Sequence, residues 1–248
     1  MLKKIASQAQ YNHKQEGVDH LLKNGWWFSR GEHTEAAFDI EIDADWYDFA
    51  GHWNRLLLDE YMRDGGTYRY RRYSAFEYSS KDEKFHLLPH APYEQSKRVN
   101  HLNGGFKRHF EPLEKCFVNH PVLSKILINF GRMFSEAAGH DRWDIKLHPY
   151  RITARESTCG EPTPEGLHQD GVDFIVSYMI SRVNVTGGTS TVTNSEKQPI
   201  GDVEMNMPND FVVGNDRETY HGVTPIAIEN TKMPVAYRDV LVIAFEKI

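Results

Sequence analysis

The stretch that decides the fold class lies near the C-terminal end of the chain and reads Ala236-Tyr237-Arg238-Asp239-Val240-Leu241-Val242-Ile243-Ala244-Phe245. Its many β-branched and aromatic side chains predict a strand over 237–246, because such side chains pack well on a pleated surface. Similar short runs, separated by Gly and Pro, precede it at 146–153, 173–180, 189–194 and 210–213. This spacing predicts a β-sandwich or a double-stranded β-helix (jelly-roll) over about 145–248.

Two stretches nearer the N-terminus have helical periodicity. Apolar residues recur at three- and four-residue steps from about residue 43 to 63, and again from about 121 to 138. Pro121 suits a first helical turn and Gly139 suits a helix end. Helices before strands predict an α+β fold in which the N-terminal helices pack on one sheet of the jelly-roll. We expect a single domain over 1–248, with 1–144 mostly helical plus flanking strands.

The composition is that of an ordinary globular protein and excludes some classes of function. A chain of 248 residues that is 40% hydrophobic can bury a sizeable core without a disulfide or a structural metal. The formal net charge of −6 argues against a nucleic-acid partner, since the phosphate backbone favours basic proteins. Cys116 and Cys159 lie far apart, and no apolar run is long enough to cross a bilayer. We therefore expect a cytoplasmic protein with no membrane partner, whose oligomeric state is open and includes a homodimer.

The strongest candidate for a site is the motif Leu167-His168-Gln169-Asp170-Gly171. On an extended backbone His168 and Asp170 point to the same face, so they can bind one metal ion as neighbouring ligands. A third ligand is needed, and His221 in Tyr220-His221-Gly222-Val223-Thr224-Pro225 is the best candidate. Two histidines and one carboxylate with open positions opposite are typical of non-haem Fe(II) oxygenases. In a chain with 13 histidines, however, a lone His-x-Asp tripeptide is more often a surface or structural pair.

The context of the motif supplies further indications. Arg238 stands early in an apolar strand, where a guanidinium is costly unless it meets an anion, and its planar fork suits a carboxylate. Asp239 offers a structural partner, although strand alternation points it to the opposite face. On the residues alone, anion binding and structural pairing of Arg238 are equally good interpretations. Thr186-Gly187-Gly188-Thr189 predicts a tight turn between two strands.

In their order along the chain, these motifs resemble the bacterial Fe(II)/2-oxoglutarate dioxygenases of the L-isoleucine hydroxylase group. The resemblance covers about 145–248 and is looser upstream, at 70–74 and 95–105. It implies that His168, Asp170 and His221 are the Fe(II) ligands and the catalytic residues. It also implies that Arg238 pairs with the distal carboxylate of 2-oxoglutarate, with Thr224 as a second contact. The reaction implied consumes O2 and 2-oxoglutarate, releases succinate and CO2, and hydroxylates a small substrate, usually a free amino acid.

Cationic strand residues are the candidates for binding a substrate carboxylate. Arg151 lies in the strand before the metal motif, and Arg71 lies in the run Arg69-Tyr70-Arg71-Arg72. Alternation puts Arg69 and Arg71 on one face, but a solvated basic edge strand explains this run equally well. Glu165 and Asp173, which flank the metal motif, are candidates for binding a substrate amine, although acidic residues in loops are usually just solvated.

Three functions remain open from the sequence. The first is a hydroxylase of a small substrate, and the second is a cupin-type jelly-roll metal protein that does not use 2-oxoglutarate. The third is a regulatory or stress-response member of the fold without turnover. Arg238 favours the first over the second, since without a keto acid that strand has little need of a cation. The complete ligand set argues against the third.

Overall fold

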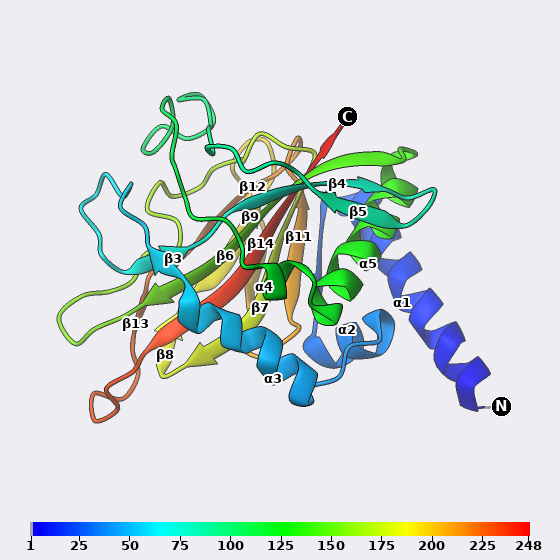
Figure 1. The fold of residues 1–248 in the computed structure, drawn as a ribbon, viewed down its shortest axis with the longest axis horizontal. Coiled ribbons are helices and arrows are strands. Elements are labelled where there is room, and N and C mark those ends of the chain that lie inside the picture. The colour runs from blue at the N-terminus through cyan, green and yellow to red at the C-terminus, as the bar shows by residue number, and fades with distance from the viewer. Residues whose placement is uncertain (1) are drawn as a thin grey trace.

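The structure is a computed structural model that describes residues 2–248, with side chains described from residue 12 onward. A large antiparallel sheet forms its centre (Figure 1). Its strands are β1 (Trp26–Ser29), β2 (Leu57–Leu58), β3 (Arg69–Arg71), β4 (Ser74–Ser79), β5 (Lys84–Leu87), β6 (Arg142–Thr153), β7 (Phe174–Val183), β11 (Phe211–Asn215) and β14 (Tyr237–Lys247). The strand order is β1-β11-β7-β14-β6-β3-β2, and β4 pairs with both β5 and β6.

A smaller layer faces the large sheet. It contains β8 (Val185–Gly187), β9 (Thr189–Thr193), β10 (Pro199–Glu204), β12 (Tyr220–Val223) and β13 (Ile226–Ile228). Strand β9 pairs with β10 and β12, and β8 pairs with β13. Apolar side chains from both layers, among them Val192, Val212 and Val240, pack in one cluster. This two-layer arrangement confirms the predicted α+β fold with a double-stranded β-helix core.

The helices cover one face of the large sheet, as predicted. They are α1 (Leu2–Asn24), α2 (Gly31–Phe38), α3 (Ala44–Gly51), the 3₁₀ turn η1 (His52–Arg55), α4 (Lys115–Val118) and α5 (Pro121–Ala138). Helices α1, α2 and α5 contact one another on that face (Figure 1). The Phe134 ring of α5 stacks on Phe174 with ring centroids 4.5 Å apart. The largest apolar cluster therefore lies between helices and sheet.

Strand alternation separates this apolar core from a cavity of mixed polar and apolar lining on the other face of the sheet. In β14, Leu241, Ile243 and Phe245 belong to the core beneath the helices. The alternate residues Arg238, Val240, Val242 and Ala244 line a cavity between the two layers. One strand thus supplies both the core and the wall of the cavity.

The helix expected over 121–138 is confirmed at both ends. Pro121 occupies its first turn, and Gly139 ends it in the left-handed conformation with φ 59°. The sequence did not indicate its N-cap, in which the His120 ring accepts a hydrogen bond from the Val122 N–H at 3.2 Å. Helix α5 is therefore the element that local sequence signals specify best.

The helix expected over 43–63 is wrong in its second half. Asp43 caps α3 by accepting from two backbone N–H groups, and the helical pattern holds through the buried Trp53 of η1. At Leu56 the backbone becomes extended, with φ −70° and ψ 150°. Leu57 and Leu58 then form β2 and pair with β3. Pairing across the sheet overrides the local apolar periodicity.

Helix α1 was not predicted. The described part of its sequence is mostly polar, and Val18 and Leu21 are its core residues. Its helical state therefore depends on packing against α5 and α2 more than on its own pattern. Among the described residues, no helix is both long and apolar enough to span a bilayer.

Candidate active site

Backbone pairing brings the distant motifs around His168 and His221 together. The His168 N–H donates to the His221 carbonyl at 2.9 Å, and the His221 N–H donates to the His168 carbonyl at 3.0 Å. This isolated bridge places the two imidazole rings with their centroids 4.4 Å apart. The expected strand around residue 168 is thus a single bridge, but it has the extended geometry that the alternation argument needs.

Asp170 completes a group of three possible metal ligands. Its Oδ2 lies 3.3 Å from Nε2 of His221 and 3.9 Å from Nε2 of His168. One ligand atom from each residue lies within 4.8 Å of the other two. Nδ1 of His168 lies 3.0 Å from the Gly166 carbonyl, which can only accept, so Nδ1 carries the proton and Nε2 is free to bind a metal.

The charge states of these side chains suit a cation. Burial by itself would raise the pKa of Asp170, but the hydrogen bond from His221 and the two imidazoles outweigh it and lower the pKa to about 2. Burial would lower the pKa of His221, yet the Asp170 carboxylate reverses this and raises it. Asp170 is therefore ionised at neutral pH and ready to act as a ligand.

Side chains around the three residues hold them in place. The buried Asp216 carboxylate accepts from the backbone N–H groups of Asp170, Gly171 and Val172, at 3.0, 2.7 and 3.0 Å. Gln95 donates to Asp170 Oδ1 at 3.3 Å. Such supporting contacts orient metal ligands. Sequence reasoning missed Asp216 and Gln95, because both lie in irregular segments without a periodic signal.

The three residues face a partly enclosed cavity of about 90 Å³ between the two layers. The large sheet contributes its inner wall, including Ile175, Ser177 and Val242. The segment between β5 and α4 contributes Tyr93, Gln95, Asn100 and Arg108 on another side. The cavity is thus built from both halves of the sequence.

Arg238 lies in this cavity as a buried cation that forms no hydrogen bond or ion pair with the described residues. Its side chain is 1% exposed, and Nε and Nη2 have no hydrogen-bond acceptor among the described residues. Burial, and then the neighbouring Arg182, lower its pKa to about 10, so it stays charged at neutral pH. Gly188 has φ 73° and would place a Cβ 3.3 Å from Arg238 Cδ, so a side chain there would crowd the guanidinium. An unpaired buried guanidinium fits an incoming carboxylate.

Asp239 is not the ion-pair partner of Arg238. It pairs instead with Arg151 on the other face of the sheet. Arg151 Nε and Nη2 donate to the two oxygens of Asp239 at 2.8 and 2.7 Å, and Nη1 donates to Asn54 at 2.9 Å. The expectation that Arg151 faces the pocket is therefore wrong. It alternates with Tyr150 and Ile152, which do line the cavity.

Thr224 also lies apart from the cavity. Its hydroxyl accepts from the Thr189 N–H at 3.0 Å, and its own N–H donates to the Thr189 carbonyl at 2.9 Å. Thr224 does not line the cavity and joins the strand segments after the Gly187–Gly188 bend, so the structure gives the predicted contact with 2-oxoglutarate no support. That bend connects β8 to β9 as consecutive strands that pair with different partners, and they do not form a hairpin with each other.

Arg69 and Arg71 are buried in the cavity wall, so the interpretation as a solvated edge strand is wrong. Arg69 pairs with the buried Asp59 at 2.8 Å, and Arg71 Nη2 lies 2.5 Å from Nδ1 of His148. Glu165 also lines the cavity. Arg108 lies in the same wall, and sequence reasoning missed it because its segment lacks periodicity.

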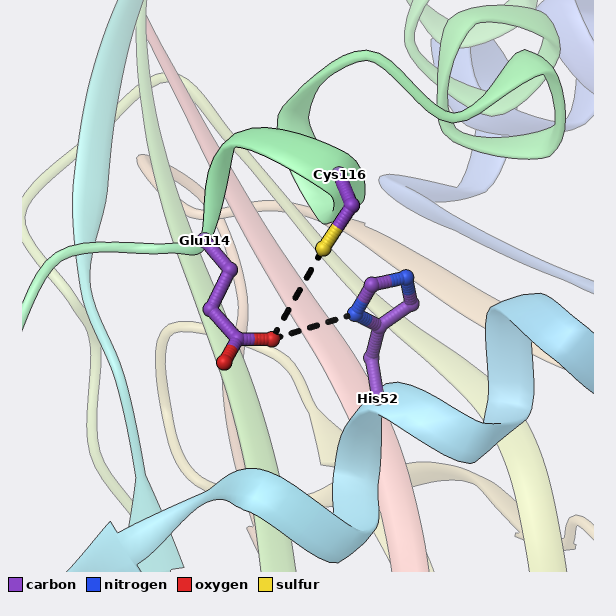
Figure 2. A group of neighbouring side chains, drawn as sticks. All are labelled: His52, Glu114 and Cys116. Atoms are coloured by element: carbon purple, nitrogen blue, oxygen red, sulfur yellow. Dashed lines mark hydrogen bonds and ion pairs between the residues drawn. The ribbon is translucent and has the colours of Figure 1, made fainter.

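A second group of possible ligands lies elsewhere, where η1 meets α4 (Figure 2). Glu114 Oε2 lies 3.5 Å from Nδ1 of His52 and 3.9 Å from Sγ of Cys116. The Arg55 guanidinium already contacts all three, with Nε 2.6 Å from Glu114 Oε2 and Nη2 2.6 Å from His52 Nδ1 and 3.9 Å from Cys116 Sγ. Here the protein itself supplies the cation.

A jelly-roll core with two histidines and one aspartate beside a cavity defines the class of non-haem iron oxygenases. The sequence model of the family described as 2OG-Fe dioxygenase matches residues 50–244. The chain therefore belongs to this family, whose members use Fe(II), 2-oxoglutarate and O2, and it is a 2-oxoglutarate-dependent dioxygenase.

Individual relatives agree with this assignment. The chain is 25% identical to an L-isoleucine-4-hydroxylase from Bacillus thuringiensis over 196 residues, which cover 76% of this chain and 80% of the relative. A bsmA homologue from Methylobium petroleophilum has a solved structure with 29% identity and a TM-score of 0.86, covering 94% of this chain and 93% of that one. The solved structure of IDO from Bacillus thuringiensis has 20% identity and a TM-score of 0.77, covering 95% and 99% respectively, and shows the same fold.

Proposed function

We propose that this protein is an Fe(II)- and 2-oxoglutarate-dependent hydroxylase of a free L-amino acid, with residues 1–248 acting as one catalytic domain. His168, Asp170 and His221 hold the iron, and Arg238 binds the distal carboxylate of 2-oxoglutarate. The observation that carries the proposal is the shared cavity. Three convergent ligands and a buried, unpartnered guanidinium line the same space.

Each of these residues has a distinct role in the proposed reaction. Asp170 supplies a negative charge and the two histidines supply neutral nitrogen ligands, which leaves coordination positions open toward the cavity. When bound there, iron and 2-oxoglutarate supply the O2-dependent oxidising chemistry of the family. Arg238 orients the co-substrate at the end of the cavity. Val240, Val242 and Ala244, on the same strand as Arg238, form an apolar part of the cavity wall.

The choice of a small amino acid as substrate has two supports. The cavity is small and only partly open, as suits a free metabolite. The relative from Bacillus thuringiensis is an L-isoleucine hydroxylase, so L-isoleucine is the first compound to test. A cupin-type protein that does not use 2-oxoglutarate would have no use for the unpaired Arg238.

The decisive experiment is anaerobic. Addition of Fe(II) and 2-oxoglutarate to the metal-free protein should produce a visible charge-transfer band, and His168→Ala should abolish it. Glu114→Gln, which alters the second ligand group instead, is the matched control and should keep the band. With O2 admitted, free L-amino acids are then screened for stimulated succinate release. A colourless wild-type mixture without iron uptake would remove the proposal.

A further inference from the structure

One side of the cavity carries more buried positive charge than the protein neutralises. Arg69, Arg71 and Arg108 all line it, and in the described part of the chain Asp59 is the carboxylate that forms ion pairs with them. Asp59 is close to Arg69 at 2.8 Å but 3.7 Å from Arg71. Arg108 donates to the neutral amide of Gln95 at 2.9 Å. This wall therefore favours an anion.

Unused donors show where that anion can bind. Arg71 and Arg108 are each 2% exposed, and the Nε–H of each has no acceptor among the described residues. Since Arg71 can only donate to Nδ1 of His148, the proton of this imidazole is on Nε2, which is also buried without a partner. Burial, and then the charge of Arg71, hold the pKa of His148 well below its usual range, so it is neutral. These donors suit a carboxylate.

An unused acceptor lies near the metal ligands. The Glu165 side chain is 8% exposed, and its Oε1 lies 3.9 Å from Nε2 of His168. Oε1 accepts a hydrogen bond from Asn100 at 3.3 Å, whereas Oε2 has no donor among the described residues. A buried carboxylate oxygen of this kind favours a cationic donor such as an ammonium group.

Two side-chain amides join these sites into one network. Asn100 Nδ2 also lies 3.4 Å from Gln95 Oε1, which is the atom that accepts from Arg108. Gln95 Nε2 in turn donates to Asp170. The network therefore fixes the position of the Glu165 carboxylate relative to the Arg108 guanidinium and to the candidate metal ligand Asp170.

We infer that the substrate binds as an α-amino acid zwitterion, its carboxylate on Arg71 and Arg108 and its ammonium group on Glu165. This inference rests on the proposed function and names the groups of the substrate that the site reads. A compound that lacks either charge leaves buried groups unpaired, which disfavours its binding. N-acylated amino acids, amino acid amides and simple amines should therefore be poorer substrates than the free amino acid.

The first test compares derivatives of one compound. The L-amino acid that most stimulates succinate release is assayed beside its N-acetyl derivative, its carboxamide and its 2-hydroxy acid. Each derivative should have a kcat/KM roughly tenfold to a hundredfold lower, the effect of losing one charged hydrogen bond. Equal activity of the N-acetyl derivative or the amide overturns the inference. So does failure of every free L-amino acid to stimulate turnover while the iron and 2-oxoglutarate band still forms.

The second test assigns the two charges to residues. Glu165→Gln and Arg108→Gln should each raise KM for the amino acid roughly tenfold or more. Glu161→Gln and Lys107→Gln, which change exposed neighbours, are the matched controls and should leave KM unchanged. Glu165→Gln should also reduce the preference for the amino acid over its 2-hydroxy acid, which a merely structural role would not do.

All four variants should keep the charge-transfer band, because none removes an iron ligand or Arg238. Loss of the band in Glu165→Gln would place Glu165 at the metal and overturn its role toward the ammonium group. Absence of the band in the wild-type protein would instead remove the proposed function itself. The two failures are therefore distinguishable.

Discussion

The two groups of possible ligands differ in what lies between them. His168, Asp170 and His221 surround a space that opens to the cavity, and no cationic side chain of the described residues enters it. His52, Glu114 and Cys116 are equally close together (Figure 2), but the Arg55 guanidinium contacts all three. Proximity of ligand atoms is therefore not enough to define a metal site.

The surroundings of the two groups also indicate that only the first is a metal site. The cavity beside the first group contains charged side chains with atoms that have no hydrogen-bond partner among the described residues, notably Nε and Nη2 of Arg238 and Oε2 of Glu165. In the second group, Glu114 and Arg55 are each partly exposed and paired with each other. An ion pair of that kind contributes little to stability and requires no ligand. Unsatisfied buried groups thus distinguish a site that awaits ligands from one that is complete.

Among the substitutions that test this difference between the two groups, Arg238→Met should have the largest effect. Removing the guanidinium should raise KM for 2-oxoglutarate about a hundredfold, since a charged bidentate contact is lost. Without 2-oxoglutarate, the same variant should raise the unfolding free energy by roughly 1–3 kcal/mol, because a buried unpaired charge is gone. Steady-state kinetics and denaturant unfolding measure the two quantities.

Arg151→Met is the matched control, because Arg151 lies opposite Arg238 across the same sheet. It should leave KM for 2-oxoglutarate nearly unchanged but lower the unfolding free energy by roughly 3 kcal/mol, since Asp239 loses its partner. If Arg151→Met impaired 2-oxoglutarate binding as strongly as Arg238→Met, the separation of the two faces would be wrong.

The next prediction tests whether Arg55 prevents the second ligand group from binding a metal ion. Arg55→Ala should increase the affinity of His52, Glu114 and Cys116 for Co²⁺ by about tenfold or more, because the competing cation is removed. A thiolate–Co²⁺ absorption band reports this site selectively, since the first group contains no sulfur. The band should disappear in Arg55→Ala/Cys116→Ser. A band of equal strength in the wild-type protein would show that Arg55 does not compete.

The smallest effect concerns pH. The pKa of His221 is raised above its ordinary value of 6.5, because the Asp170 carboxylate outweighs the effect of burial. Because of this raised pKa, the His221 imidazole keeps its proton to a higher pH. Protons therefore compete with Fe(II) for His221 already above pH 6.5. Iron affinity should therefore fall progressively as the pH is lowered from about 8 to about 6, because the imidazole must lose its proton before it can bind the metal. Iron titrations across this range measure it, and a constant affinity down to pH 6 would contradict it.

Much of the site followed from local sequence patterns. The His-x-Asp spacing works because alternation on an extended backbone holds wherever the segment lies. Arg238 stood out because a charge early in an apolar strand needs a partner. In contrast, nothing local marks Asp216, Gln95 or Arg108, whose roles arise from the segments that fold against them.

Two wrong predictions, for Arg151 and for the helix over 43–63, show what local sequence patterns cannot determine. Arg151 and Arg71 both lie in β-prone runs, and on the residues alone both were candidates for binding the substrate carboxylate. The register of β6 decided between them, since it turns Tyr150 toward the cavity and Arg151 toward Asp239. The C-terminal part of the helix expected over 43–63 failed because pairing with β3 is a long-range contact.

By itself, the sequence determined the β-rich character of the C-terminal half, the N- and C-terminal ends of α5, and the pairing of His168 with Asp170 as neighbouring candidate ligands, because each depends on spacing within a few residues. The tertiary structure alone decided which face of each strand meets the cavity, which cations remain unpaired, and which ligand group is already closed by an arginine. Those features depend on strand register and on contacts between residues tens of positions apart, and local periodicity carries no information about either.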